Sequence, residues 1–99
     1  MKLIDLERYH VFQFDGDTKI YLLNENYHNL FTGKCQFEWH RIYNDGRTNM
    51  RGIASFDALW LENTEVTDLG DFYDWMKANH PKRYFKEGWE LSRPKKKGE

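Results

Sequence analysis

The chain has 99 residues, of which 39% are hydrophobic and 17% aromatic, and its formal net charge at pH 7 is −1. A chain of this length forms a single domain, and aromatic rings that each bury about 150–250 Å² can build much of its core. Its one cysteine, Cys35, excludes an intramolecular disulfide, and the sequence has neither a membrane-spanning apolar stretch nor a signal-peptide pattern, so we expect a cytoplasmic protein.

Residues 8–23 predict a first β-hairpin. The β-prone runs 8–14 and 19–23 flank the segment Asp15-Gly16-Asp17-Thr18, and Asp-Gly between two such runs is a strong turn signal. Apolar residues occur on both faces of both strands. Because a half-solvated strand carries its apolar residues on one face only, we expect neither strand to be half-solvated.

The next segment, residues 24–33, predicts a short helix between two hairpins. Tyr27, Leu30 and Phe31 have helical spacing, Asn24 suits an N-cap, and Gly33 suits the position just after the last turn. Such a helix would cover one edge or one face of the sheet.

A second β-hairpin is predicted over residues 34–56. Its turn is Asn44-Asp45-Gly46-Arg47, and its first strand shows the most regular alternation in the chain, with these residues on one face: Cys35, Phe37, Trp39, Arg41 and Tyr43. We expect the apolar stretch 58–61 to continue the sheet as a fifth strand.

An amphipathic helix is predicted within residues 65–79, with Thr64 or Thr67 as its cap. Its apolar stripe consists of Val66, Leu69, Phe72, Tyr73 and Met76. At 100° per residue these positions span an arc of about 120°, the usual width of a buried helix face. Pro81 stops this helix, because the residue before a proline is disfavoured in helical geometry. Residues 83–91 then predict a short strand interrupted at Gly88.

Together these elements predict an α+β fold, a small antiparallel sheet of four or five strands in two hairpins packed with one amphipathic helix near the C-terminus and one short helix between the hairpins. We expect residues 1–92 to form one globular domain. Residues 93–99 are expected to be a disordered basic tail, since the last six residues have no apolar side chain.

Charge is distributed unevenly along the chain. Residues 1–80 carry eight Lys and Arg against thirteen Asp and Glu, whereas residues 81–97 carry seven Lys and Arg against two acids. Such an asymmetry bears on the kind of partner that a chain binds.

Acidic residues wind around the side of the predicted helix that faces away from its apolar stripe. They are Glu65, Asp68, Asp71 and Asp74, and Trp75 lies among them. A tryptophan that lies among acids and off the core stripe is a candidate anchor for protein contact. The alternative is a solvated helix face on which the C-terminal segment covers Trp75.

The C-terminal segment interleaves cations with aromatic rings, and its candidate nucleic-acid-binding residues are Lys82, Arg83, Tyr84, Lys86, Trp89, Arg93, Lys95, Lys96 and Lys97. Cations neutralise phosphates and rings stack on bases, so this composition is typical of a nucleic-acid contact. The alternative is a solubilising tail, or one that folds back on the acidic body.

The best enzymatic candidate is the pair Glu38 and His40, which share a strand face. With Arg51 across the hairpin, a carboxylate beside an imidazole can perform acid–base cleavage of RNA. The plain alternative is a solvated polar face with one ion pair. The histidines and Cys35 lack zinc-type spacing and no glycine-rich phosphate loop occurs, so we expect no metal and no cofactor.

Absence of a catalytic motif makes a non-enzymatic protein-binding module the leading hypothesis. It would act as an inhibitor or modulator through the acidic helix face and exposed rings, as small phage or viral accessory proteins do. One candidate partner is a nucleic-acid-binding protein, for which the acidic face would mimic nucleic acid. That comparison is an analogy with no motif behind it. Nucleic-acid binding by the basic C-terminal segment ranks second, and a small ribonuclease third.

Overall fold

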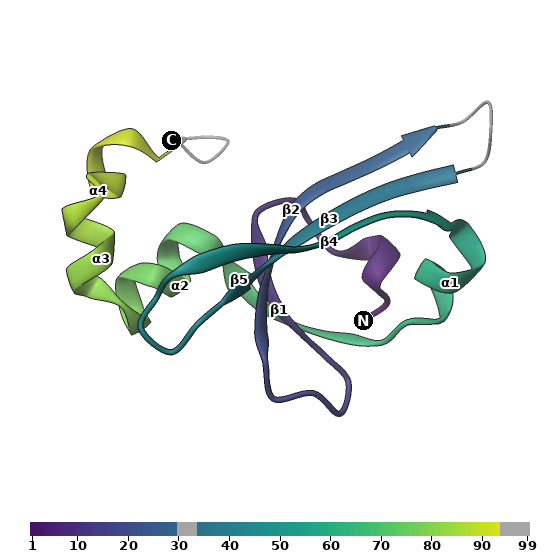
Figure 1. Cartoon of the computed structure of the whole chain (residues 1–99), viewed down its shortest axis with the longest axis horizontal. Helices are drawn as coiled ribbons and strands as arrows, with labels where there is room; N and C mark the ends of the chain where they lie inside the picture. Colours follow the sequence, from purple (N-terminus) through teal and green to yellow (C-terminus); the bar gives the residue numbers. More distant parts are fainter. Residues whose placement is uncertain (30–33, 94–99) are drawn as a thin grey trace.

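The computed structural model describes the backbone of residues 1–29 and 34–93, and the side chains of residues 1–27, 37–49 and 59–93. Five strands form one antiparallel sheet in the order β4-β3-β2-β1-β5 (Figure 1). The strands are β1 (His10–Phe14), β2 (Ile20–Asn29), β3 (Lys34–Ile42), β4 (Thr48–Asp57) and β5 (Val66–Asp71). The predicted α+β fold with an antiparallel sheet is confirmed.

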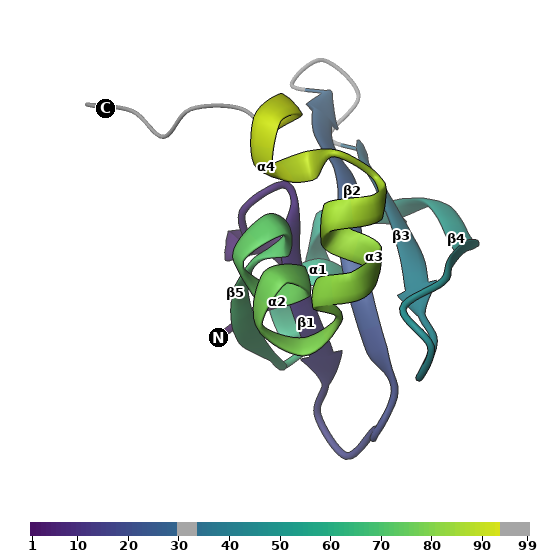
Figure 2. The same cartoon turned by 90° about the vertical axis from the view of Figure 1, so that its left-hand side faces the viewer.

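Short helices lie at both ends of this sheet: η1 (Leu3–Asp5), α1 (Ala58–Asn63), α2 (Phe72–Asn79), α3 (Pro81–Lys86) and α4 (Trp89–Ser92). Figure 1 shows α2, α3 and α4 at one end of the molecule and η1 and α1 at the other. Figure 2 shows the first group from its own end, in front of the strands. Within the described residues, no helix is long and apolar enough to span a membrane.

Both predicted hairpins form, β1 with β2 and β3 with β4. In each turn an aspartate accepts a hydrogen bond from the backbone two residues ahead. Asp17 accepts from the Lys19 amide at 2.9 Å, and Asp45 accepts from the Arg47 amide at 3.0 Å. The short carboxylate side chain thus stabilises each turn locally, which is why the sequence signal was sufficient.

Apolar side chains pack on both faces of the sheet, as the first hairpin predicted. A first core cluster lies under η1 and α1 and contains Leu3, Leu6, Phe12, Leu23, Phe37, Leu61 and Val66. A second core cluster lies under α2 and α3 and contains Val11, Leu22, Ile42, Phe72, Met76 and Tyr84. Neighbouring residues such as Leu22 and Leu23 belong to different clusters, because successive side chains of a strand point to opposite faces.

The helix predicted within residues 65–79 begins only at Phe72, so that part of the prediction is wrong. Val66–Asp71 is β5, which pairs with β1. Gly70 has a φ of +98°, outside helical geometry, and the Asp71 carboxylate caps α2 by accepting from the Asp74 amide at 3.0 Å. Residues 66–71 were predicted to be helical from the spacing of their apolar residues, but their backbone N–H and C=O groups bond to β1 instead. The predicted stop before Pro81 is confirmed, since α2 ends at Asn79.

Three shorter predictions are also corrected. Residues 24–29 continue β2, which pairs with β3 as far as Asn29, and residues 30–33 lie outside the described part. The stretch 58–61 belongs to helix α1, where Leu61 joins the first core cluster, so the fifth strand is β5. The predicted strand over residues 83–91 is instead the end of α3 and most of α4, separated by a turn at Gly88. Pro81 occupies the first position of α3, where its missing N–H costs nothing.

Candidate functional site

The acidic residues predicted as a protein-binding face are dispersed and paired within the chain. Glu65, just before β5, forms ion pairs with the N-terminal amino group at 3.1 Å and with Lys2 at 2.6 Å. Hydrogen bonding from Lys2 lowers the pKa of Glu65 below its ordinary value. Asp68, on β5, lies 2.9 Å from Nδ1 of His10. Neither carboxylate belongs to the helix.

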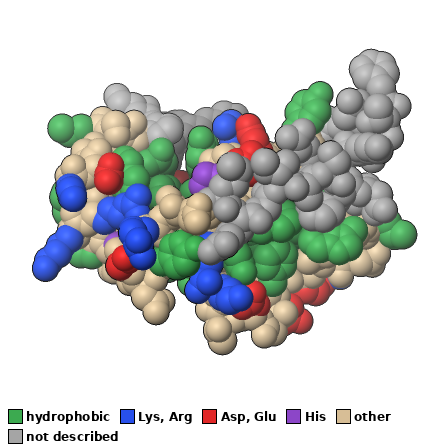
Figure 3. Space-filling view, viewed as in Figure 1, with side chains coloured by type: hydrophobic (Ala, Val, Ile, Leu, Met, Phe, Trp, Pro, Cys, Tyr) green, Lys and Arg blue, Asp and Glu red, His purple; other side chains and the backbone are tan. Residues whose placement is uncertain are grey.

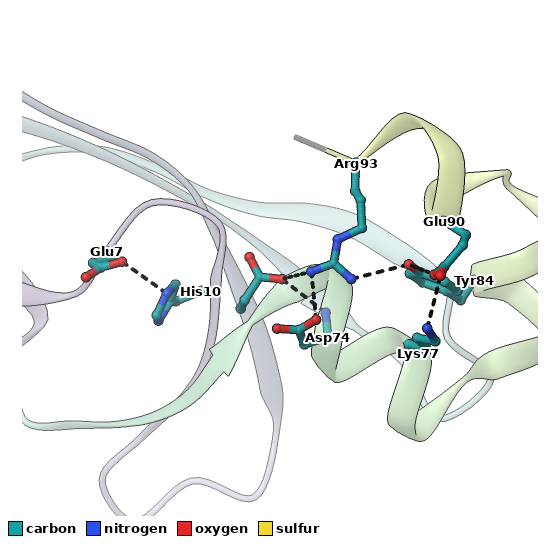
Figure 4. Close-up of polar contacts among 8 residues, drawn as sticks. Glu7, His10, Asp74, Lys77, Tyr84, Glu90 and Arg93 are labelled. Carbon is teal, nitrogen blue, oxygen red and sulfur yellow. Dashed lines mark hydrogen bonds and ion pairs between the residues drawn. The ribbon is translucent and has the colours of Figure 1, made fainter. Parts of the chain in front are cut away.

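Asp71 and Asp74 share one cation, Arg93. A guanidinium nitrogen of Arg93 lies 2.7 Å from Asp74 and 3.5 Å from Asp71, and the side chain is 20% exposed. Figure 4 shows Arg93 between Asp74 and Tyr84, at the junction of α2 and α4. We expected the disordered tail to begin at Arg93, but this residue belongs to the packed part of the chain. These acids are therefore partly neutralised before any partner arrives.

Trp75 packs partly against the second core cluster and is half-buried. Its ring centroid lies 5.5 Å from that of His80. Trp75 thus keeps part of its surface exposed, and its role as an anchor for protein contact stays a prediction.

The two rings predicted to stack on bases hold the C-terminal helices in place. Tyr84 is 0% exposed, and its hydroxyl donates to Glu90 and accepts from Arg93 at 3.4 Å. The Tyr84 hydroxyl and then the Lys77 ammonium lower the pKa of Glu90. Trp89 is half-buried, with its ring 5.3 Å from that of Phe72. Lys95, Lys96 and Lys97 lie outside the described residues.

An open groove of about 510 Å³ separates α3 from the turn between β3 and β4. We call it the basic groove, and the described residues that line it are Asp45, Arg47, Thr48, Lys82, Arg83, Lys86 and Glu87. Figure 3 shows Lys and Arg side chains gathered at the end of the molecule that carries α3 and this turn. Sequence reasoning found Lys82, Arg83 and Lys86 but missed Arg47, which lies in a distant turn with no charge cluster of its own.

The turn and the helix are held together by one charged donor. Arg83 donates to the carbonyl oxygen of Gly46, and its guanidinium carbon lies 5.6 Å from the centroid of the Trp89 ring. Arg83 thereby positions the groove wall. Asp45 binds Nε of Arg47 at 2.6 Å, and hydrogen bonding from the Arg47 amide lowers the pKa of the Asp45 carboxyl.

Lys82 and Lys86 are exposed cations of the basic groove on the side of α3. Neither forms an ion pair within the part of the chain that the structure describes. Residues four apart on a helix lie side by side, with about 5–6 Å between their Cβ atoms. The groove therefore carries two adjacent unpaired ammonium groups on one wall and Arg47 on the other.

Glu38 and His40 do lie together, with 3.4 Å between His40 Nε2 and a Glu38 oxygen. Asn24 also donates to Glu38, at 3.3 Å, and both members of the pair are mostly covered, with 19% and 25% of their side chains exposed. The side chain of Arg51, the third member of the ribonuclease hypothesis, lies outside the described residues. Among the described side chains, no group of three potential metal ligands occurs.

Comparison with protein-family models, with curated proteins and with solved structures finds no match to this chain. Its function is therefore inferred from the chemistry of its own residues.

Proposed function

We propose that the chain binds nucleic acid and that the basic groove is its contact with phosphate groups. The observation that supports this is the convergence of Lys82, Lys86 and Arg47 from two separate segments around one open groove. Lysine and arginine neutralise phosphates and release condensed counterions, which supplies most of the sequence-independent affinity of such proteins. The proposed contact keeps the predicted basic residues of α3. It adds Arg47 from the turn and leaves out Tyr84, which is buried, and Trp89, which is half-buried.

Arginine and lysine have complementary parts in this contact. Arg47 binds Asp45 through Nε, and within the described residues its two terminal nitrogens form no hydrogen bond. Those nitrogens present a planar fork that suits two phosphate oxygens, whereas each lysine acts as a point charge. Asp45 orients the fork and reduces the net charge of the groove, as Glu87 also does.

Protein binding through Trp75 and its acidic neighbours has weaker support. Glu65, Asp68 and Asp74 each have a cationic or imidazole partner in the chain. A basic partner protein would have to compete with those contacts. No comparable internal partner competes for Lys82 and Lys86 among the described residues.

Binding of a labelled oligonucleotide of about 20 nucleotides, followed by fluorescence anisotropy at several salt concentrations, tests the groove directly. Lys82→Gln/Lys86→Gln removes two phosphate contacts. We expect the slope of log affinity against log salt to become shallower by about 1.4 for a single strand, and affinity at about 0.1 M salt to fall at least tenfold.

The matched control is Lys2→Gln/Lys77→Gln, which removes the same charge from two exposed ion pairs away from the groove. Such pairs contribute about 0–1 kcal/mol, so the control should fold and should keep the wild-type salt slope. An equal loss of affinity in both double variants would show that binding depends on the overall charge and not on the basic groove. If no oligonucleotide binds with a salt dependence, the proposed function is wrong.

A further inference from the structure

A second open pocket lies on the sheet face that carries the first core cluster. Its volume is about 370 Å³, and its described lining is Lys19, Tyr21, Trp39 and Arg41, which we call the ring pocket. Tyr21 on β2 lies directly opposite Arg41 on β3, and Trp39 lies two residues further along the same strand. Paired strands therefore hold the two rings and Arg41 together on a rigid support, and Lys19 lies just before β2.

The rings of this pocket are held in place by a third ring. The Phe14 centroid lies 5.3 Å from that of Tyr21 and 5.6 Å from that of Trp39, and both pairs meet edge to face. Tyr21 also donates from its hydroxyl to Asp17 at 3.3 Å. Tyr21 and Trp39 are half-buried, so each retains exposed surface beside the pocket. Preformed aromatic surface of this kind binds planar rings at little cost in conformational entropy.

The ring pocket and the basic groove are linked through Tyr43. The guanidinium carbon of Arg41 lies 4.7 Å from the centroid of the Tyr43 ring, and that of Arg47 lies 5.8 Å from it. Arg41 lines the ring pocket and Arg47 lines the groove. Figure 3 shows Lys and Arg side chains both at the helical end and lower in the same view, beside hydrophobic side chains. One ring thus separates the two sites.

Arg41 and Lys19 are the two cations of the ring pocket. Within the described part of the chain neither forms an ion pair, and the buried Nε of Arg41 has no hydrogen-bond partner. Cations beside aromatic rings match a nucleotide, whose base stacks on a ring while its phosphate meets a positive charge.

We infer that the ring pocket binds an unstacked nucleobase of a strand whose neighbouring phosphates occupy the basic groove. This inference rests on the proposed nucleic-acid binding and names its ligand class, single-stranded nucleic acid. The faces of bases inside a duplex are covered by their neighbours, so a stacking pocket accepts bases only from loops, ends or single strands.

The test compares a normal single strand with one of equal length made of abasic sites, which has the same phosphates and no bases. The wild-type chain should bind the abasic strand about fivefold or more weakly, at a similar salt slope, since stacking on one ring contributes at least that factor. Trp39→Leu should lower affinity for the normal strand to near the abasic value and leave abasic binding unchanged. Tyr21→Leu should act in the same direction.

The matched control is Trp60→Leu, because Trp60 lies on α1, outside the pocket, and is 40% exposed. It should preserve discrimination between the two strands. A second experiment uses only the wild-type chain, so its result does not depend on whether a variant folds. Photocrosslinking to a strand that carries 5-bromouridine should modify the peptide containing Tyr21 or the one containing Trp39.

The outcomes separate this inference from the proposed function. Equal, steeply salt-dependent binding of normal and abasic strands by the wild-type chain would overturn the ring pocket and leave the groove proposal standing. Crosslinks confined to other rings, such as Phe85, would also overturn it. Failure of both strands to bind would overturn both proposals.

Discussion

Gly46 illustrates how one residue can hold together two distant segments of this chain. It has a φ of +86° in the turn between β3 and β4, and a Cβ added there would lie 3.0 Å from Cγ of His80. Its carbonyl oxygen accepts the hydrogen bond from Arg83. The position therefore requires both left-handed backbone geometry and the absence of a side chain, which glycine alone supplies.

Gly46→Ala should lower the free energy of unfolding more than Gly16→Ala, which makes a matched control. Gly16 has a similar φ of +80°, but no atom lies within 4 Å of an added Cβ. The control should lose about 1–2 kcal/mol from backbone strain, and Gly46→Ala about 1 kcal/mol more from the contact with His80. Urea denaturation measures both values. Equal losses in the two variants would show that the turn moves away from His80 without a cost in stability.

At the scale of elements, α4 is attached to α2 by polar contacts and by the ring of Trp89, which lies 5.3 Å from that of Phe72. Arg93 binds Asp74 and Asp71, and Glu90 binds Lys77 and the Tyr84 hydroxyl (Figure 4). An α-helix of four residues cannot persist by its own backbone hydrogen bonds. These side chains and the packing of Trp89 therefore keep α4 in place.

Two truncations distinguish the contribution of Arg93 to stability from that of the residues after it. A chain ending at residue 93 should unfold at the wild-type temperature, whereas a chain ending at residue 92 should lose about 1–2 kcal/mol, because Asp74 and Asp71 lose their charged donor. Arg93→Gln in the full chain should reproduce that loss. Calorimetry provides the measurement. If the chain ending at residue 93 is already destabilised, residues 94–99 contribute to the fold.

At the scale of the whole molecule, one sheet separates two core clusters. Leu22 is 5% exposed and belongs to the second cluster, and Leu23 is 0% exposed and belongs to the first. Because both clusters share the same strands, neither can lose its packing without disturbing the support of the other.

Leu22→Ala and Leu23→Ala should therefore each lower the stability of the entire chain, by about 2–5 kcal/mol. Each variant should show a single unfolding transition at which far-ultraviolet circular dichroism and tryptophan fluorescence change together. The fluorescence includes the signals of Trp39 and Trp89, which pack on opposite sides of the sheet. Separate transitions for the two probes in either variant would mean that the two clusters unfold independently.

Local patterns were sufficient wherever the deciding interaction lies within a few residues. Asp17 and Asp45 specify the two hairpin turns, and Pro81 specifies the end of α2. The alternation of apolar residues on both strand faces likewise predicted a sheet covered on both sides. The basic residues of α3 were identified by composition.

Only the tertiary structure decided which of two locally acceptable conformations a segment adopts. Residues 66–71 have a helical apolar period, yet they pair with β1, which lies far away along the chain. The groove depends in the same way on Arg47 and Lys82 meeting across a fold that neither local sequence specifies. Backbone pairing and charge convergence between distant segments depend on positions in space, and a pattern read along the chain contains no information about those distances.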